Sequence, residues 1–321
     1  MKKEFLLLFL LFWGGLSRAA TGPGVAGSPL LAQPVGARPL SLGASYTALS
    51  DDSLATLWNP AGLVSLRFSE AGFIFDQSPG GVNYGHLLYA KPVSAGQGIG
   101  LGLGMLQVED VDYHDLSGNL NYLAGQSDWV MAASYAVSLK PLLAFPDPAS
   151  VNVSGGLTVK YLWTKLGGGL NARTPAVDLG LLASLPFPGA PLPTRLGVSW
   201  QNMGGQVKYG KEADPVASPV RVGIAQTIPE NSGAWLTATV EGVRYLARNE
   251  VEMHMGIEQV FKPAGSVGLA VRCGYRMNTD LPGVSAGAGI RWSNFILDYG
   301  MAQLGVLGFV HRVGLRIELG E

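Results

Sequence analysis

The sequence predicts an all-β protein: a transmembrane antiparallel β-barrel of about 14 strands with a small N-terminal plug, in the outer membrane of a bacterial cell. Three observations predict it. An export signal opens the chain, no later apolar run is long enough for a membrane helix, and apolar and polar residues alternate from Leu66 onward. Composition agrees, because only 14% of the 321 residues are charged and 45 are glycine, about twice the usual ~7% share.

Residues 1–20 are expected to be a signal peptide. Two lysines precede the apolar run Phe5–Trp13, and a small-x-small cleavage site follows at Ser17 and Ala19. That run is well short of the roughly 20 residues of a membrane helix, so an uncleaved anchor is the weaker alternative. No cysteine stands directly after the cleavage site, where a lipid anchor would be attached. Cys273 is the only cysteine in the chain, so it has no partner for an internal disulfide.

Residues 21–64 are expected to form the plug, because their pattern does not alternate. Asp51, Asp52 and Ser53 are favourable helix-start residues, Leu54–Leu57 is long enough for one helical turn, and the following proline and glycine stop it. The plug motif consists of Asn59, Pro60, Ala61 and Gly62.

Residues 65–321 are expected to form one barrel domain. In one representative strand the outward set is Trp129, Met131, Ala133, Tyr135, Val137 and Leu139. A closed barrel gives every backbone N–H and C=O an internal partner in hydrocarbon, and an even number of strands puts both chain ends on one side. The expected external loops include Glu109–Ser127, Thr164–Thr174 and Met203–Ser218, in alternation with short turns such as Pro229–Gly233 and Trp292–Asn294.

Four glycines on one face of a single strand indicate where the plug packs. They are Gly98, Gly100, Gly102 and Gly104. Glycine at every inward position weakens a strand unless another backbone approaches closely, so we expect this face to contact the plug. A dinucleotide fingerprint is disfavoured, because a strict period of two provides neither a turn nor a helix N-terminus.

Charged residues at inward positions of the second half of the chain have two interpretations. The set comprises Arg221, Arg272, Arg276, Arg291, Arg312 and Arg316 with Glu241, Glu252, Glu258, Asp298 and Glu318. The arginines would guide an anionic amphiphile by matching its carboxylate head. The alternative, an ion-pair lattice that stiffens the wall, is favoured because the two signs nearly balance.

Other residue groups argue against an enzyme, a cofactor, a metal site and a nucleic-acid partner. His86, His114, His254 and His311 lack paired ligand spacing, and a solvated loop explains Glu109, Asp110, Asp112 and Asp115 better than a divalent-cation site does. The sequence places no Ser-His-acid set and no catalytic carboxylate pair. A net charge of -1 with scattered Lys and Arg is unsuited to binding phosphates.

The run from Gly36 to Asp52, followed by Trp58–Leu63, resembles the N-terminal signature of the PorV/PorQ group of FadL-like outer-membrane proteins. Later segments are also similar: Leu196–Gly205, Cys273–Arg276, Leu297–Gly300 and His311–Arg312. The resemblance implies a fourteen-stranded barrel with an N-terminal hatch that contains Asn-Pro-Ala. This sequence departs from the pattern at Pro39 and Ser41, where Ala and Gly are expected, and it ends in Gly-Glu instead of an aromatic residue.

The leading functional hypothesis is a passive conduit for hydrophobic small molecules. A ligand would arrive from the external loops, meet the plug near Asn59 and Pro60, and leave either downward or sideways through the wall. The rival is a component of a type IX-like protein-secretion system that binds secreted proteins through Met203–Ser218 and the acidic loop. A third reading is a structural barrel. The implied partners are outer-membrane lipid with either a hydrophobic ligand or secretion-system proteins.

Overall fold

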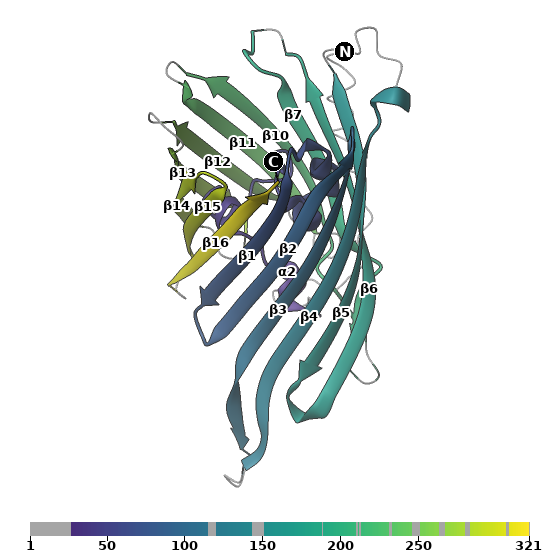
Figure 1. Cartoon of the computed structure of the whole chain (residues 1–321). Coiled ribbons are helices and arrows are strands. Elements are labelled where there is room, and N and C mark those ends of the chain that lie inside the picture. The colour runs from purple at the N-terminus through teal and green to yellow at the C-terminus, as the bar shows by residue number, and fades with distance from the viewer. Residues whose placement is uncertain are drawn as a thin grey trace.

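A computed structural model describes residues 27–320 except 115–119, 143–150, 188, 210, 212, 231–232, 246–250, 263–266, 280–282 and 306–307. Within these residues fourteen antiparallel strands close into a barrel (Figure 1), so the predicted fourteen-stranded antiparallel barrel is confirmed. The predicted signal peptide, residues 1–20, and Asp115 lie outside the described residues. No helix in the described part of the chain is both long and apolar enough to cross a membrane.

The barrel closes where β1 (Ser69–Ser78) pairs with β16 (Phe309–Leu319), from Ser69 opposite Leu319 to Gln77 opposite His311. We call the end where β1 begins and β16 ends the terminal end, and the opposite end the hairpin end. The remaining barrel strands are β2 (Val82–Ser94), β3 (Gln97–His114), β4 (Leu120–Ser138), β5 (Asn152–Leu166), β6 (Leu170–Leu185), β7 (Thr194–Met203), β10 (Pro219–Pro229), β11 (Trp235–Tyr245), β12 (Val251–Phe261), β13 (Val267–Met277), β14 (Gly283–Trp292) and β15 (Phe295–Gln303).

The two faces of the wall differ as the alternation predicts. Outward side chains such as Leu101, Met131 and Val159 are more than half exposed, at 54%, 55% and 52%, whereas their strand neighbours point inward and are buried. Apolar side chains cover the outer face because lipid tails offer no hydrogen bonds, and polar side chains gather inside.

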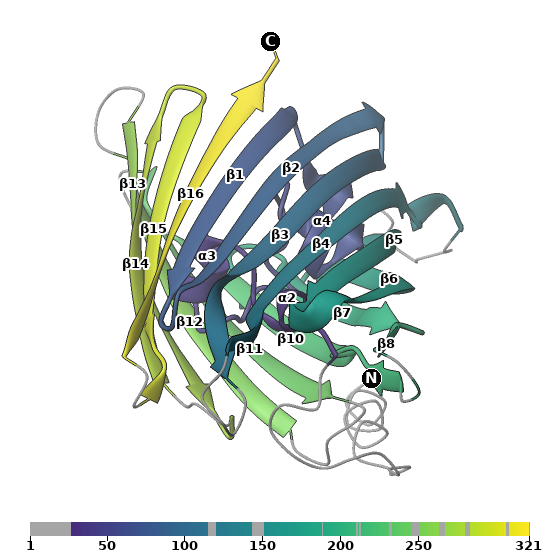
Figure 2. The same ribbon diagram turned by 90° about the horizontal axis from the view of Figure 1, so that it is seen from below.

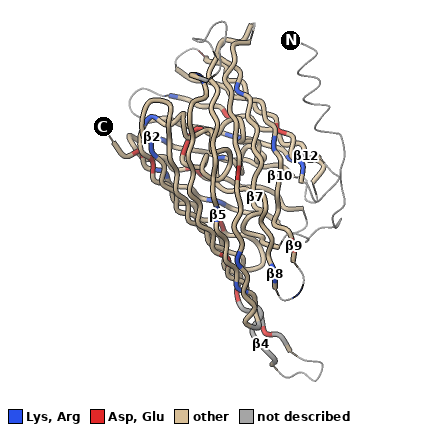
Figure 3. Tube along the Cα trace, turned by 90° about the vertical axis from the view of Figure 1, so that its right-hand side faces the viewer, with Lys and Arg blue, Asp and Glu red and all other residues tan. Residues whose placement is uncertain are grey.

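Two predicted external loops are wrong. Glu109–Ser127 and Thr164–Thr174 consist mostly of strand, because β3 continues to His114 before β4 begins, and β5 and β6 are separated by only the short 3-10 helix η3 (Gly167–Gly169). The β3–β4 hairpin extends well beyond the rest of the barrel (Figure 3). Connection lengths do not alternate as expected either, since the β4–β5 connection at the terminal end is long and contains η2 (Lys140–Leu142).

The predicted loop Met203–Ser218 is a connection that folds back over the hairpin end of the lumen. It contains a small sheet of β8 (Gln206–Lys208) and β9 (Ala213–Pro215). Val207 of β8 is fully buried and packs in one apolar cluster with Leu30 and Leu162.

Residues 28–66, which we call the lumenal segment, lie inside the barrel (Figure 2). They form α2 (Pro29–Ala32), α3 (Ala37–Ser41), α4 (Ala55–Trp58) and the 3-10 helix η1 (Pro60–Ser65). The expected helical turn at Leu54–Leu57 is α4, displaced by one residue. Apolar side chains of this segment form the central core of the molecule together with three wall residues, Ile74, Leu88 and Ala225.

Candidate functional site

Asn59 fastens the lumenal segment to the barrel wall. Its side chain is fully buried, and Nδ2 donates to the carbonyl oxygens of Thr47 and Leu181, each at 3.0 Å. Its Oδ1 accepts from the backbone N–H of Ala61 at 3.3 Å, which caps the start of η1. Because buried amide groups must be paired, this residue fixes both the internal turn and its position on β6.

The other residues of the Asn59–Gly62 motif keep that turn compact. Pro60 occupies the first position of η1, where a missing N–H costs nothing. The carbonyl of Ala61 accepts from Ser154 Oγ on β5 at 2.9 Å. Gly62 lies so close to the backbone of Ser50 that a side chain there would overlap the Ser50 carbonyl.

Inward glycines surround the lumenal segment on most strands of the barrel, and we call this set the glycine collar. A Cβ at Gly197 would lie 2.5 Å from the Thr47 carbonyl oxygen, and one at Gly256 would lie 2.7 Å from that of Leu42. Wall backbone and segment backbone therefore touch, which only glycine permits. The collar consists of Gly72, Gly98, Gly100, Gly156, Gly180, Gly197, Gly223, Gly256, Gly274, Gly287, Gly300 and Gly314.

The structure brings three of the four predicted wall glycines to the lumenal segment. A Cβ at Gly98 would overlap the Leu63 carbonyl, one at Gly100 would overlap the Thr56 hydroxyl, and one at Gly102 would lie 3.6 Å from Leu57 Cδ2. Gly104 instead lies against the side chains of His86 and Val130 on the neighbouring strands. Sequence reasoning missed the rest of the collar, because those glycines occur singly and only their inward position in an alternating strand marks them.

Arg38, which sequence reasoning also missed, connects the segment to the wall. Its guanidinium donates to Glu258 on β12 at 2.9 Å, to Asp51 at 2.8 Å and to the Tyr46 hydroxyl at 3.1 Å. Burial opposes ionisation of Asp51, but the Arg38 and Arg195 guanidiniums outweigh it and hold the pKa of that carboxyl below its usual value. Burial likewise opposes the charge of Arg38, but Glu258 and the neighbouring acids raise the pKa of Arg38 well above its usual value.

Most of the predicted inward arginines are paired with carboxylates. Arg221 pairs with Glu241 at 2.8 Å, Arg272 with Glu258 at 2.6 Å and Asp298 at 2.8 Å, Arg316 with Asp52 at 2.7 Å and Asp298 at 3.1 Å, and Arg312 with Asp76. Arg291 pairs with Glu318 at 2.8 Å at the exposed terminal end. His254 Nε2 lies 3.1 Å from Glu252 Oε2, which accepts the hydrogen bond. Arg276 forms no ion pair with another described residue.

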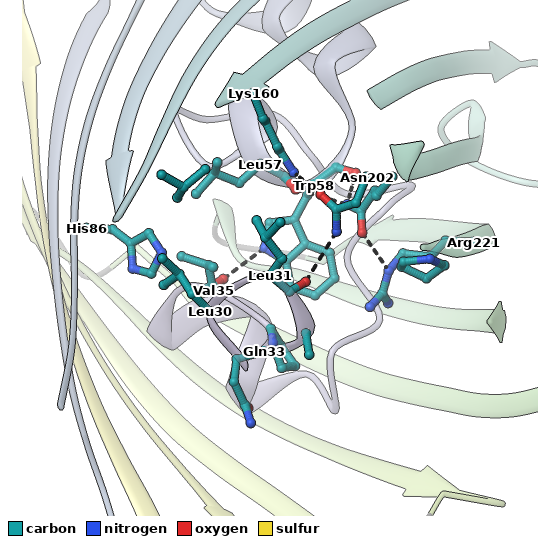
Figure 4. A pocket seen from close by; sticks show the side chains of 15 residues that line it. Leu30, Leu31, Gln33, Val35, Leu57, Trp58, His86, Lys160, Asn202 and Arg221 are labelled. Atoms are coloured by element: carbon teal, nitrogen blue, oxygen red, sulfur yellow. Dashed lines mark hydrogen bonds between the residues drawn. The ribbon is translucent and has the colours of Figure 1, made fainter. Parts of the chain in front are cut away.

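A cavity of about 40 Å³ lies on the hairpin side of the segment (Figure 4). Leu30, Leu31 and Leu57 form its apolar side. Lys160 and His86 reach it from the wall, and Lys160 is held by Asp178 at 2.7 Å, whereas the buried His86 ring has no hydrogen bond to another described residue. This volume holds a few water molecules and is smaller than the roughly 150 Å³ that admits benzene, so the site is closed in this state.

An open basin of about 590 Å³ lies on the terminal side of the segment. Charged groups line it, among them Arg38, Asp51, Glu70, Arg195 and Arg316. The lumenal segment therefore separates a small cavity of mixed polarity from a large, open basin lined by charged residues.

The remaining candidate residues do not assemble into a metal site. Within the described residues no three His, Cys, Asp or Glu side chains are grouped to hold a metal ion. His311 instead contacts the Tyr299 hydroxyl through Nδ1 at 2.7 Å, and His254 lies 3.3 Å from the Ala44 carbonyl oxygen. Cys273 is exposed on the outer face.

Comparison with known proteins identifies relatives of the fold. No protein-family profile and no curated protein matches the sequence. Among solved structures, the Ralstonia pickettii toluene transporter TbuX superposes with a TM-score of 0.58 at 11% identity, over 89% of this chain and 98% of that one. The CymD monoaromatic hydrocarbon channel gives 0.56 at 12% identity over 91% and 99%, and a Pseudomonas aeruginosa FadL homologue gives 0.52 at 8% over 89% and 98%. At this identity the likeness concerns the fold, which is that of a FadL-like barrel.

Proposed function

We propose that this protein is a bacterial outer-membrane barrel that conducts hydrophobic small molecules passively, with the lumenal segment as its plug. The observation that carries the proposal is the position of that segment, which closes a lipid-facing barrel between a small cavity and an open basin. Barrels of the same fold that are described as monoaromatic hydrocarbon channels and toluene transporters support it.

The proposal assigns a direction to the barrel. Outer-membrane barrels keep their chain ends on the periplasmic side, so the terminal end and its charged basin face the periplasm. The hairpin end, with β8–β9 and the extended β3–β4 hairpin, then faces the exterior. A hydrophobic molecule arriving there reaches the cavity beside α2 and the Asn59–Gly62 turn.

We interpret the inward charges as structural. Arg221, Arg272 and Arg316 each bind buried carboxylates, and the Arg38–Glu258 pair extends the same network to the plug. Ions that satisfy one another are poor ligands for a passing carboxylate, because their pairing must first be broken. An uncharged hydrophobic ligand suits this interior better than an anionic amphiphile.

Uptake measurements test the proposed function. Cells lacking the protein and cells that express it are supplied with radiolabelled toluene, with a long-chain fatty acid and with a hydrophilic sugar as the control. We expect faster accumulation of toluene in expressing cells and no change for the sugar. Equal uptake of every hydrophobic compound by the two strains would refute the proposal.

The extended β3–β4 hairpin favours a second candidate function, a secretion-system component of the PorV/PorQ type. The strands of this hairpin run from Gln97 to Ser138 and extend beyond the other hairpins (Figure 3), which suits a surface that binds other proteins. Deleting its tip is then expected to remove secreted proteins from the cell surface while hydrocarbon uptake stays unchanged. The opposite pattern would favour the conduit.

A further inference from the structure

We propose that a hydrophobic molecule passes the plug through a gate of three aliphatic side chains, Leu57, Ile74 and Leu88, while the lumenal segment itself stays in the barrel. This inference rests on the proposed function, because it specifies the route and the size limit of the conduit.

Contacts between the collar and the segment are not equivalent around the barrel. On most strands, as at Gly197 and Gly256, an added Cβ would meet segment backbone. Near the β16–β1 seam it would meet side chains alone: Ala37 Cβ lies 3.8 Å from the position at Gly314, and Ser53 Oγ lies 3.1 Å from that at Gly72. A contact with segment backbone, or with the Ala37 methyl group, opens only if the segment moves, whereas a contact with the Ser53 or Ile74 side chain opens by a rotamer change.

Aliphatic side chains fill this sector together with the stem of Arg316, whose Cγ lies 3.8 Å from the Cβ position at Gly72. Ile74 and Leu88 are 3% and 4% exposed and belong to the central apolar cluster, against which Leu57 packs. Leu57 and Leu88 meet beside Gly102, whose Cβ position lies 3.6 and 3.3 Å from their respective Cδ2 atoms. The buried Ser53 hydroxyl, which faces Gly72, has no hydrogen-bond partner in the described structure, so opening this sector breaks no hydrogen bond of that group.

The register of β1 and β2 places this sector between the two compartments. Ile74 pairs with His86, which lines the cavity, and two residues farther along Gly72 pairs with Leu88. Two residues beyond that, Glu70 pairs with Ala90 and lines the basin. These inward positions form a path of about 13 Å at the usual rise of a strand.

The chemistry of the gate selects the ligand. Aliphatic walls favour an uncharged apolar molecule, and the close packing of Leu57 and Leu88 beside Gly102 limits its size. Arg316 borders this path beside Gly72, and ion pairs with Asp52 at 2.7 Å and Asp298 at 3.1 Å hold its guanidinium.

Truncation of the gate tests its role as a size filter. Cells expressing Ile74→Ala with Leu88→Ala are compared with wild type for uptake of naphthalene relative to toluene. Leu42→Ala is the control, because Leu42 is also buried in the same cluster but lies against Gly256 on β12, where segment backbone meets the wall. We expect the double variant to raise the naphthalene-to-toluene ratio severalfold and the control to leave it unchanged.

A crosslink tests whether the segment stays in place. In a Cys273→Ser background, Ala48→Cys with Gly223→Cys places two Cβ atoms 3.5 Å apart, within the range of a disulfide. Toluene uptake should be the same in the oxidised and reduced protein. Uptake that is lost on oxidation and restored by reductant would show that the whole segment moves, which overturns the gate.

The outcomes separate this inference from the function it rests on. If wild type transports neither probe, the conduit itself is refuted and the gate with it. If wild type transports toluene but the truncations and Leu42→Ala give the same ratio, the gate alone is refuted. Heat-modifiable migration in gels establishes that each variant has folded before its uptake is compared.

Discussion

Asn59 of the lumenal segment lies directly against Gly180 of β6, so that a methyl group at position 180 would overlap the Asn59 amide oxygen. The same amide donates to the carbonyl of Leu181 at 3.0 Å. The absence of a side chain at Gly180 lets Asn59 come close enough to donate to Leu181, and this hydrogen bond in turn holds the lumenal segment against β6.

Replacing Gly180 with alanine is expected to displace the lumenal segment. The added methyl group forces Asn59 out of position, and overpacking of this kind costs about 1–3 kcal/mol. The temperature at which the barrel loses its folded gel migration should fall. Gly242→Ala is the control, because only Met253 Sδ comes as near as 4.0 Å to its Cβ position, and it should not be destabilised.

Asn59→Ala is expected to loosen the segment without opening the barrel. The substitution leaves the Thr47 carbonyl without its amide partner and removes the cap of η1, at a cost of about 1–3 kcal/mol. Limited proteolysis in detergent should cut residues 28–66 faster than in wild type. Asn171→Ala removes one exposed hydrogen bond to Gly169, so equal rates in the two variants would contradict this role of Asn59.

The Asp51 carboxylate should stabilise the folded lumenal segment at neutral pH and lose this effect in acid. Its pKa is lower in the folded than in the unfolded protein, because Arg38 and Arg195 outweigh the effect of burial. The stabilisation is therefore complete above the unfolded value of about 3.9 and declines as the pH falls through the lower folded value. The difference in thermal midpoint between wild type and Asp51→Asn should shrink in that range, and a constant difference would contradict the assignment.

Arg272 and Arg276 should respond differently to removal, although both point inward from β13. Arg272→Ala leaves buried Glu258 and Asp298 each without one partner, at a cost of the order of 3 kcal/mol. Arg276→Ala removes no ion pair within the described residues and should have a much smaller effect. Urea unfolding in micelles measures both, and equal losses would show that the ion pairs of Arg272 are not what stabilises the wall.

The period of two in the sequence is sufficient to predict the barrel, because lipid on one side imposes it on every strand. The parts of β3 and β4 at the hairpin end were predicted as a loop for the same reason. Outside the lipid a strand needs only its backbone ladder, so the polar residues around Glu109 and Ser127 read as loop.

The sequence could suggest one part of the collar but not the whole. Gly98 and Gly100 stand out because they repeat in a single strand, whereas Gly180 and Gly256 are single residues in different strands. The choice of partner for each arginine is also beyond sequence reasoning. Arg38 and Glu258 are separated by 220 positions, and only the closed fold brings them together.

The glycine collar gives the barrel a check on its own assembly. If β6 slipped by one residue against its neighbours, Leu179 or Leu181 would turn inward where Gly180 now admits Asn59, since a slip of one position exchanges the two faces of a strand. The lumenal segment could then not occupy its position against the wall. A barrel whose strands are out of register therefore cannot hold the lumenal segment. The segment fits only when the strands around it are paired in the correct register.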